Sequence, residues 1–304
     1  MSVDKLKRDI RRLAKEKDAI ILAHNYQVGD VQDVADLCGD SLELSIKAAA
    51  TSARVVVFCG VNFMAESASV LCPDKRVLLA HPSAGCPMAD AVTAASLRAR
   101  RAELPGVPVV TYVNSTAEVK AESDVCCTSA NVNSVVRSLE GPRVLMTPDR
   151  NLALYAQRHT DKELLLWAGC CPVHDRLSAD DVLAAKAAHP GALFVAHPEC
   201  RPEVLDLADA IRSTTGMMAF CRQSSAAAFI IGTEQGLLYP LRRDNPGKAF
   251  VSPSDKLICP DMKLTTLAHV MEALDTGRGE VKVPEPVATR ARRAIERMLQ
   301  VPRD

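Results

Sequence analysis

The sequence has few aromatic residues, no excess of charge of either sign and no long apolar run. Phe, Trp and Tyr make up 4% of the 304 residues, which argues against a surface on which nucleic-acid bases stack. Lys+Arg and Asp+Glu number 37 each, so the chain as a whole does not favour a polyanion. No apolar run is long enough to span a membrane. The stretch MSVDKLKRDIRRLAKEKD predicts a charged amphipathic helix rather than a secretion signal. We therefore expect a cytoplasmic protein whose partners are neither nucleic acid nor membrane.

Cysteine is the one residue type whose distribution suggests a special role. Eleven cysteines are too few for a disulfide scaffold of this length, and an odd number indicates free thiols, a metal or a cluster. A Cys-Pro step occurs three times, at Cys86, Cys171 and Cys259, with separations of 85 and 88 residues. This spacing predicts that the chain contains a repeat.

Other landmarks recur with a similar period. Short apolar runs at 19–27, 108–116 and 192–200 place His24, Tyr112 and His197 at equivalent positions. A hydroxyl side chain follows each of these residues by 17 positions, at Ser41, Ser129 and Thr214. Two further sets of apolar runs complete each copy, at 54–60, 143–149 and 229–236, and at 76–82, 163–169 and 248–254. Four landmarks in one order, three times over, predict a triplicated unit.

The apolar runs are typical of strands that are buried on both faces. They are continuous in Val, Ile and Leu, as in a parallel sheet covered by helices, and helical segments such as 40–53 and 132–141 lie between them. Asp40 or Ser41 is the expected cap of the first of these helices. The sequence predicts an α/β protein of three homologous three-layer αβα domains with short parallel sheets, at 1–90 with an N-terminal helix, 91–176, and 177–304 with a C-terminal helical extension.

Ligand groups in such sheets lie just past the carboxyl ends of the strands, where the recurring polar residues fall. Packing of the three units around a pseudo-threefold axis would bring one Cys-Pro loop from each to a common centre. Three thiolates suit a four-iron cluster with one open iron, or a zinc ion with an open position. Three structural cysteines are the plainer alternative, and the other cysteines are expected to be small buried hydrophobes. The hydroxyls are expected either to bind an anion or simply to cap helices.

Nine segments together resemble the quinolinate synthase family, the A protein of bacterial NAD biosynthesis. They are spread over residues 19–270, nearly the whole chain, and read AHNYQ (23–27), GDSLELS (39–45), GVNFMAES (60–67), TYVNS (111–115), CPVH (171–174), HPEC (197–200), STTGM (213–217), IGTEQGLLYPL (231–241) and CPDMK (259–263). The resemblance implies condensation of iminosuccinate with dihydroxyacetone phosphate to quinolinate, phosphate and water. It also implies three α/β domains around a central site that contains a [4Fe-4S] cluster with one open iron.

The resemblance assigns roles to individual positions. It implies that Cys86, Cys171 and Cys259 hold the cluster, and that Tyr26, Tyr112, His197 and Glu199 are catalytic. Substrate-binding positions are implied at His24, Ser41, Tyr112, Asn114, Ser129, His197, Glu199 and Thr214. His174 and Lys263 lie in the same motifs and are expected near the site. An aspartate oxidase or dehydrogenase is the implied upstream enzyme, because iminosuccinate is unstable.

One position departs from the family pattern, and several alternatives remain. Asp261 stands where an amide or aromatic residue is expected, and the doubled cysteine at 170–171 leaves a second register open, with Cys170 as the ligand. A cluster-dependent hydro-lyase acting on a small dicarboxylate would use the same open iron. A redox sensor would need a partner-binding patch, and a zinc protein would contain no iron or sulfide.

Overall fold

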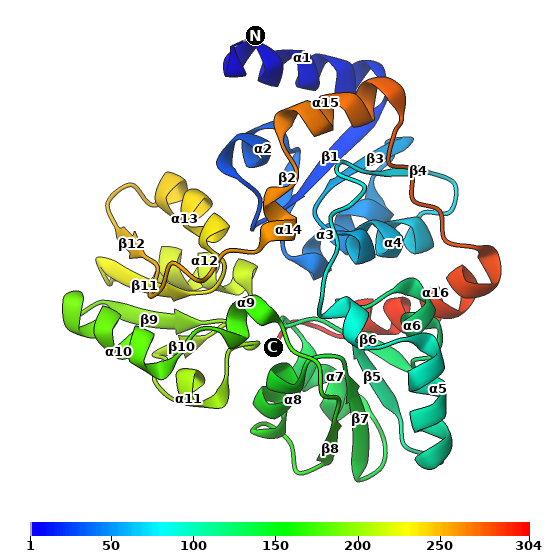
Figure 1. Cartoon of the computed structure of the whole chain (residues 1–304), viewed down its shortest axis with the longest axis vertical. Coiled ribbons are helices and arrows are strands. Elements are labelled where there is room, and N and C mark those ends of the chain that lie inside the picture. Colours follow the sequence, from blue (N-terminus) through cyan, green and yellow to red (C-terminus); the bar gives the residue numbers. More distant parts are fainter. Residues whose placement is uncertain (1) are drawn as a thin grey trace.

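The computed structural model describes residues 2–304, which form three α/β units around a common centre (Figure 1). Each unit contains one four-stranded sheet whose paired strands all run parallel. Helices alternate with the strands along the chain and cover the sheets. The predicted fold class, three αβα domains with short parallel sheets, is confirmed.

The first unit follows an N-terminal helix, α1 (Val3–Glu16). Its elements are β1 (Ala19–His24), α2 (Gly29–Val34), β2 (Leu37–Gly39), α3 (Ser41–Ala50), β3 (Val55–Cys59), α4 (Asn62–Leu71) and β4 (Arg76–Leu79), followed by the short helix η1 (Ala89–Ala91).

The second unit repeats this order. Its elements are α5 (Ala94–Glu103), β5 (Val109–Tyr112), α6 (Ala117–Ala121), β6 (Val125–Cys127), α7 (Val132–Ser138), β7 (Arg143–Thr147), α8 (Arg150–Gln157), β8 (Glu163–Leu166) and α9 (Pro172–Asp175).

The third unit repeats it again and is followed by two further helices. Its elements are α10 (Ala179–Ala188), β9 (Leu193–Ala196), α11 (Pro202–Leu205), β10 (Ala210–Ile211), α12 (Thr214–Gln223), β11 (Ala228–Gly232), η2 (Gln235–Leu237), α13 (Leu238–Asp244), β12 (Ala249–Val251) and α14 (Pro260–Lys263). The two helices after it are α15 (Leu267–Thr276) and α16 (Glu285–Leu299).

Strand order is the same in all three sheets, namely second, first, third, fourth. The first and third strands of each unit are central and almost wholly buried, which explains why they read as unbroken Val/Ile/Leu runs. The nine strands expected from the apolar runs are all present. Three further strands, β2, β6 and β10, have only two or three residues each and are not apparent in the sequence pattern.

These short strands determine where the polar residues lie. Each pairs with the carboxyl end of the first strand in its unit, so that His24 lies opposite Gly39 and Tyr112 opposite Cys127. In the third unit Ile211 lies opposite Ala196, the residue before His197. Because a helix begins shortly after each short strand, the hydroxyl 17 residues downstream is brought to the same sheet edge.

The helices begin at side chains that satisfy their free N–H groups. Asp40 caps α3 by accepting the backbone N–H of Glu43 at 3.0 Å, so Asp40 and not Ser41 is the cap. Ser213 caps α12 in the same way through the N–H of Gly216, at 3.3 Å. Asp304 reaches across from the end of the chain to accept the N–H groups of Asn133 and Ser134 on α7, at 2.9 and 2.8 Å.

The packed core is continuous between the units. One cluster of buried side chains joins the second and third units, and another joins the first and third. Helix α15 packs on α1 and α2 of the first unit, whereas α16 packs on α6 and β6 of the second (Figure 1). The end of the chain therefore contacts units that lie far from it in sequence.

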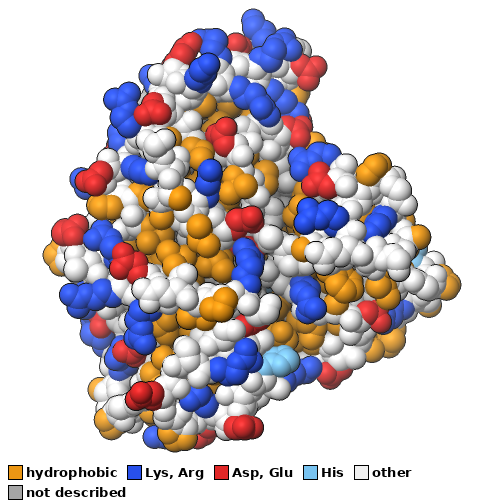
Figure 2. Space-filling model, turned by 180° about the vertical axis from the view of Figure 1, so that it is seen from behind, with side chains coloured by type: hydrophobic (Ala, Val, Ile, Leu, Met, Phe, Trp, Pro, Cys, Tyr) orange, Lys and Arg blue, Asp and Glu red, His pale blue; other side chains and the backbone are white. Residues whose placement is uncertain are grey.

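The surface seen from behind has three lobes, and its Lys/Arg and Asp/Glu side chains are interspersed (Figure 2). Among residues 2–304, no helix combines the length and apolar character that crossing a membrane requires.

Candidate active site

A cavity of about 190 Å³ lies between the three units. All twelve site residues expected from the sequence line it, which are His24, Tyr26, Ser41, Cys86, Tyr112, Asn114, Ser129, Cys171, His197, Glu199, Thr214 and Cys259. They come from three separate thirds of the chain. The threefold recurrence in sequence is therefore matched by convergence in space.

The residues that follow the first strand of each unit are deeply buried in the cavity wall. His24, Tyr112 and His197 are 6%, 4% and 3% exposed. The Tyr112 hydroxyl donates a hydrogen bond to Glu199 Oε1, and His197 Nε2 lies 3.2 Å from Ser129 Oγ. Contacts therefore cross from the second unit to the third inside the cavity.

The three recurring hydroxyls face the cavity rather than capping helices. The N-cap residues of α3, α7 and α12 are Asp40, Asn131 and Ser213. Ser41 and Thr214 are the first helical residues after two of these caps. The sequence analysis expected these hydroxyls either to bind an anion or to cap helices. The structure does not agree with capping.

Two buried amide oxygens in this region have no hydrogen-bond partner within residues 2–304. They are the Oδ1 atoms of Asn114, which lines the cavity, and of Asn25, which contacts the lining residue Thr214. The Asn25 amide nitrogen donates to Thr214 Oγ1 at 3.0 Å, so its side chain is fixed across the boundary between the first and third units. A buried polar atom without a partner carries a free-energy cost, and an orphaned acceptor beside a cavity indicates a bound polar ligand.

The three Cys-Pro loops have a common local structure. Cys171 and Cys259 are the N-cap residues of α9 and α14, with Pro at the first helical position, and Cys86 precedes η1. In each loop the sulfur faces the backbone N–H three residues later, on Ala89, His174 and Met262. The loops therefore present their sulfurs to N–H donors at the start of a helical turn.

The thiols are poorly placed to ionise by themselves. Burial raises the pKa of Cys86 to about 12, and burial likewise raises the pKa of Cys171 and of Cys259. All eleven cysteines are free of disulfides. Cys171 lines the cavity and Cys170 does not.

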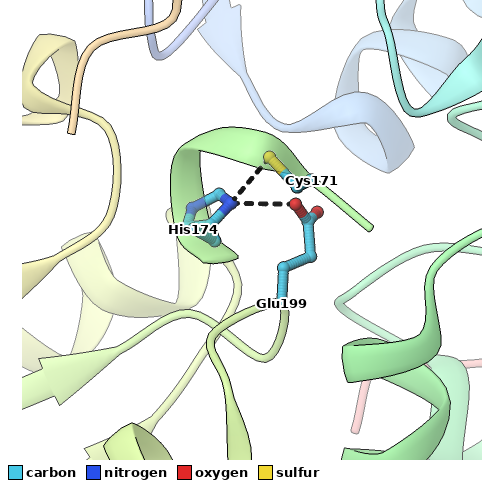
Figure 3. Close-up of side chains that lie close together, drawn as sticks. All are labelled: Cys171, His174 and Glu199. Atoms are coloured by element: carbon cyan, nitrogen blue, oxygen red, sulfur yellow. Dashed lines mark hydrogen bonds and ion pairs between the residues drawn. The ribbon is translucent and has the colours of Figure 1, made fainter. Parts of the chain in front are cut away.

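His174 connects a cysteine to a carboxylate (Figure 3). Its Nδ1 lies 3.2 Å from Cys171 Sγ and 2.9 Å from Glu199 Oε2, and the close-up shows both side chains directed at the same ring edge. On the other side of the ring, Nε2 lies 2.8 Å from Thr233 Oγ1, which also contacts the Tyr26 hydroxyl. A continuous chain of hydrogen bonds thus runs from Tyr26 through Thr233, His174 and Glu199 to Tyr112.

Glu199 is ionised in this chain. Burial by itself raises the pKa of a carboxyl, but His174 and His197 and the hydrogen bonds from His174 and Tyr112 more than offset it and lower the pKa of Glu199. Burial, and next the charge of Glu199, keep the pKa of Tyr112 well above its usual range. The pair is therefore a carboxylate with a protonated phenol against it.

Comparison with known proteins leads to the family that the sequence resembles. The family model for quinolinate synthetase A protein matches residues 8–300. The chain belongs to this family. A quinolinate synthase of Geobacter sp. (strain M21) is 56% identical over 304 residues, which is 100% of both chains. One from Methanoregula boonei is 57% identical over 294 residues, 97% of each chain, and one from Dehalococcoides mccartyi (strain ATCC BAA-2266 / KCTC 15142 / 195) is 50% identical over 301 residues, 99% of this chain and 100% of the other.

Three further side chains contribute to the site of this family member, although the sequence analysis did not identify them. Thr233 completes the hydrogen-bond chain described above. Asp149 and Glu234, 1% and 0% exposed, lie beneath the second and third cysteine loops. Burial, and next the charge of Glu199, raise the pKa of Asp149 to about 8. All three follow the third strand of their unit, where the motifs TPD and GTE are the only local signal.

Lys263 and Asp261 also lie at the third cysteine loop. Lys263 Nζ is 2.7 Å from Glu234 Oε1, and it also donates to the backbone oxygen of Tyr26. Asp261, at the position where the sequence analysis expects an amide or aromatic residue, accepts the backbone N–H of Gly85 at 3.0 Å. Both residues therefore tie the third unit to the first.

The cavity fits a metal cofactor held by cysteines. Its wall contains one cysteine from each unit, each with an N–H donor at its sulfur, and burial raises the pKa of each thiol. Cys171, His174 and Glu199 also lie within 4.8 Å of one another. Three soft sulfur ligands with N–H support suit iron–sulfur chemistry better than hard, oxygen-bound cations.

Proposed function

We propose that the protein condenses iminosuccinate with dihydroxyacetone phosphate, giving quinolinate, phosphate and water. One observation carries the proposal, which is that twelve side chains from three units of a quinolinate synthetase A protein line a single cavity. The reaction is a transferase reaction of NAD biosynthesis, and we place it in the cytoplasm. An aspartate oxidase or dehydrogenase is the upstream source of iminosuccinate, because that compound does not accumulate.

Cys86, Cys171 and Cys259 are the proposed ligands of a [4Fe-4S] cluster. When bound through three cysteines, the cluster supplies one iron with a free position, a Lewis acid for a substrate oxygen or nitrogen. The N–H groups of Ala89, His174 and Met262 stabilise the thiolate form of each ligand once it is paired with iron.

Substrate carboxylates are proposed to bind at the hydroxyls of Ser41, Ser129 and Thr214. Ser41 and Thr214 open ten-residue helices, whose N-terminal N–H groups and dipoles favour anions. The free Oδ1 of Asn114 accepts a hydrogen bond from a substrate donor, either an N–H or a hydroxyl. These groups orient both substrates for carbon–carbon bond formation.

Glu199 is the proposed general base. Condensation requires removal of a proton from the carbon next to the imine, and an ionised, buried carboxylate is suited to that task. Tyr112 then donates or receives a proton at the same place, since its hydroxyl already contacts Glu199. His174 and Thr233 carry the hydrogen-bond chain onward to Tyr26, which allows a proton to move away from the reacting carbon.

His24 and His197 are proposed to bind substrate as neutral rings. Burial lowers the pKa of His24 to about 4 and that of His197 to about 3, so both are uncharged at neutral pH. A neutral imidazole both donates and accepts hydrogen bonds. Tyr26, buried beside Thr233, closes the cavity on the side of the first unit.

The test is an assay of anaerobically purified protein with iminosuccinate and dihydroxyacetone phosphate. We expect quinolinate and phosphate to form together. A brown, iron-replete sample that makes no quinolinate would overturn the proposal. Dehydration of a small dicarboxylate by that sample would assign it to the hydro-lyases instead, and colourless zinc-containing protein would exclude the cluster.

Glu199→Gln tests the proposed base while preserving its size. We expect kcat to fall by about 10²–10⁴-fold, because the amide cannot accept the proton, with the cluster retained. Glu203→Gln is the matched control, because Glu203 is exposed a few residues further along the chain. Equal loss of activity in both variants, or none in Glu199→Gln, would remove Glu199 from its role.

The cluster ligands are tested one at a time. Cys86→Ala, Cys171→Ala and Cys259→Ala should each lose the [4Fe-4S] cluster, measured as iron and sulfide per chain and by the cluster absorbance. Cys72→Ala should retain it, because Cys72 is buried outside the cavity and donates to the Ala48 carbonyl at 3.0 Å. Cys170→Ala should also retain the cluster. Loss of the cluster in this variant would mean that Cys170, and not Cys171, is the ligand.

A further inference from the structure

Two of the three cysteine loops are held by a buried acidic side chain of their own unit. Asp149 Oδ2 accepts the backbone N–H of Cys171 at 2.9 Å, and Glu234 Oε1 accepts that of Cys259 at 3.2 Å. Both acids stand two residues past the third strand of their unit, β7 and β11. Each also accepts a second backbone N–H nearby, so each is fixed in place. In these two units, the repeat therefore includes an acidic side chain that fixes the backbone of the cysteine.

The first unit has no acidic side chain at the equivalent position. The residue two positions past β3 is Val61, a buried apolar side chain that cannot accept a hydrogen bond. Within the first unit the N–H of Asn62 donates to the Ala84 carbonyl of the loop at 2.8 Å. The N–H of Gly85, directly before Cys86, needs an acceptor from elsewhere.

Asp261 supplies that acceptor from the third unit. Its Oδ1 accepts the Gly85 N–H at 3.0 Å, and its side chain lines the cavity beside Cys86 and Cys259. Its own backbone N–H faces the Cys259 sulfur. One residue thus contacts the loops of two cysteines that are 173 positions apart in sequence.

We propose that Asp261 is a positioning residue for the iron–sulfur cluster, holding the Cys86 loop in register with the Cys259 loop. The proposal rests on the cluster assignment made above. Outer-shell carboxylates that orient metal ligands typically change metal affinity by 10–100-fold when removed. A carboxylate beside a cluster also lowers its reduction potential, because added negative charge disfavours the reduced state.

Two substitutions separate the hydrogen bond from the charge. Asp261→Asn retains an oxygen that accepts the Gly85 N–H but removes the charge, whereas Asp261→Ala removes both. Asp255→Ala is the control, because Asp255 is an exposed acid on the segment that leads to the same loop. The measurements are iron release to a chelator under anaerobic conditions and the midpoint potential of the cluster, both made on reconstituted full-length protein.

We expect Asp261→Ala to release iron about 10-fold faster than the wild type and Asp261→Asn to release it at the wild-type rate. The midpoint potential should rise in both variants and stay unchanged in Asp255→Ala. Wild-type iron release from Asp261→Ala, or equally fast release from Asp261→Asn and Asp261→Ala, would overturn the positioning role. A wild-type chain that binds no cluster would instead overturn the proposed function, so the two failures are distinguishable.

Discussion

Buried ionisable groups of the cavity lie in different charge states within a few ångströms, although the pKa of each is lowered. His197 is neutral because burial lowers its pKa to about 3, and Glu199 beside it stays ionised, with His197 Nδ1 3.8 Å from Glu199 Oε1. Burial lowers the pKa of His24 in the same way, to about 4. The ionised Glu199 therefore lies in the same cavity as two uncharged imidazole rings.

The neutral histidines make the stability of the cluster-free protein depend on pH. The folded pKa of His24 lies below the unfolded value of 6.5, so as pH falls the unfolded chain takes up the proton first. Stability is therefore fully present above pH 6.5 and is lost as pH falls toward about 4. We expect His24 to contribute about 2 kcal/mol to the loss between pH 7 and pH 5.

Urea unfolding of the wild type and of His24→Gln at these two pH values measures that contribution. The loss of unfolding free energy should be smaller in His24→Gln by the stated amount, since glutamine does not titrate. Identical losses would show that the pKa of His24 is the same in the folded and the unfolded protein.

The elements divide into those that sequence predicts and those that it does not. Long buried strands such as β3 were predictable because both of their faces are covered and every residue is apolar. The strand β10 has two residues and contains no pattern, although it places Thr214 at the cavity. Its pairing depends on the neighbouring strand, which local sequence does not encode.

The site was predictable to the extent that it repeats. Recurrence at a fixed offset identified Ser41, Ser129 and Thr214 without any knowledge of the fold. Thr233 and Asp261 could not be found this way, because each acts on a partner in another unit. Contacts of this kind are fixed by the packing of the three units, and no periodicity in the sequence reports them.

Packing between α1 and α15 shows how one element stabilises a distant one. Ile10 of α1 is fully buried in a cluster with Val270 and Leu274 of α15. Ile10→Ala should lower the free energy of unfolding by about 2–5 kcal/mol, through lost burial and the cavity left behind. Chemical denaturation measures the change, and Leu183→Ala is the control, because Leu183 is 51% exposed on α10 and should change it by no more than about 0.5 kcal/mol. A small effect of Ile10→Ala would mean that α1 is not held by α15.

On the scale of the whole molecule, the last residues join units that the sheets keep separate. Arg303 makes a bidentate pair with Asp40 of the first unit, at 2.7 and 3.1 Å, while Asp304 caps α7 of the second. Asp40 also accepts from Ser213 of the third unit at 3.3 Å. The division at 90/91 and 176/177 stays a prediction, because the helices after α14 pack away from the third sheet.

Arg303→Ala should lower the free energy of unfolding by about 1–3 kcal/mol. Asp40 is 5% exposed, so loss of the guanidinium leaves a buried carboxylate with fewer partners. Arg303→Lys should recover part of the loss, because lysine preserves the charge without the paired geometry. Arg293→Ala, an exposed arginine on α16, is the control for denaturation curves. Equal stability of Arg303→Ala and Arg293→Ala would show that the pair is only a surface contact.

The position of α15 has a consequence for biosynthesis on the ribosome. The first sheet emerges early, yet the helix that covers its outer side together with α1 begins only at Leu267. We predict that a nascent chain arrested before Leu267 leaves the exit tunnel remains open to proteases near α1. A chain arrested after release of residue 276 should become resistant there. Equal protection of both nascent chains would show that the N-terminal third matures without waiting for translation to finish.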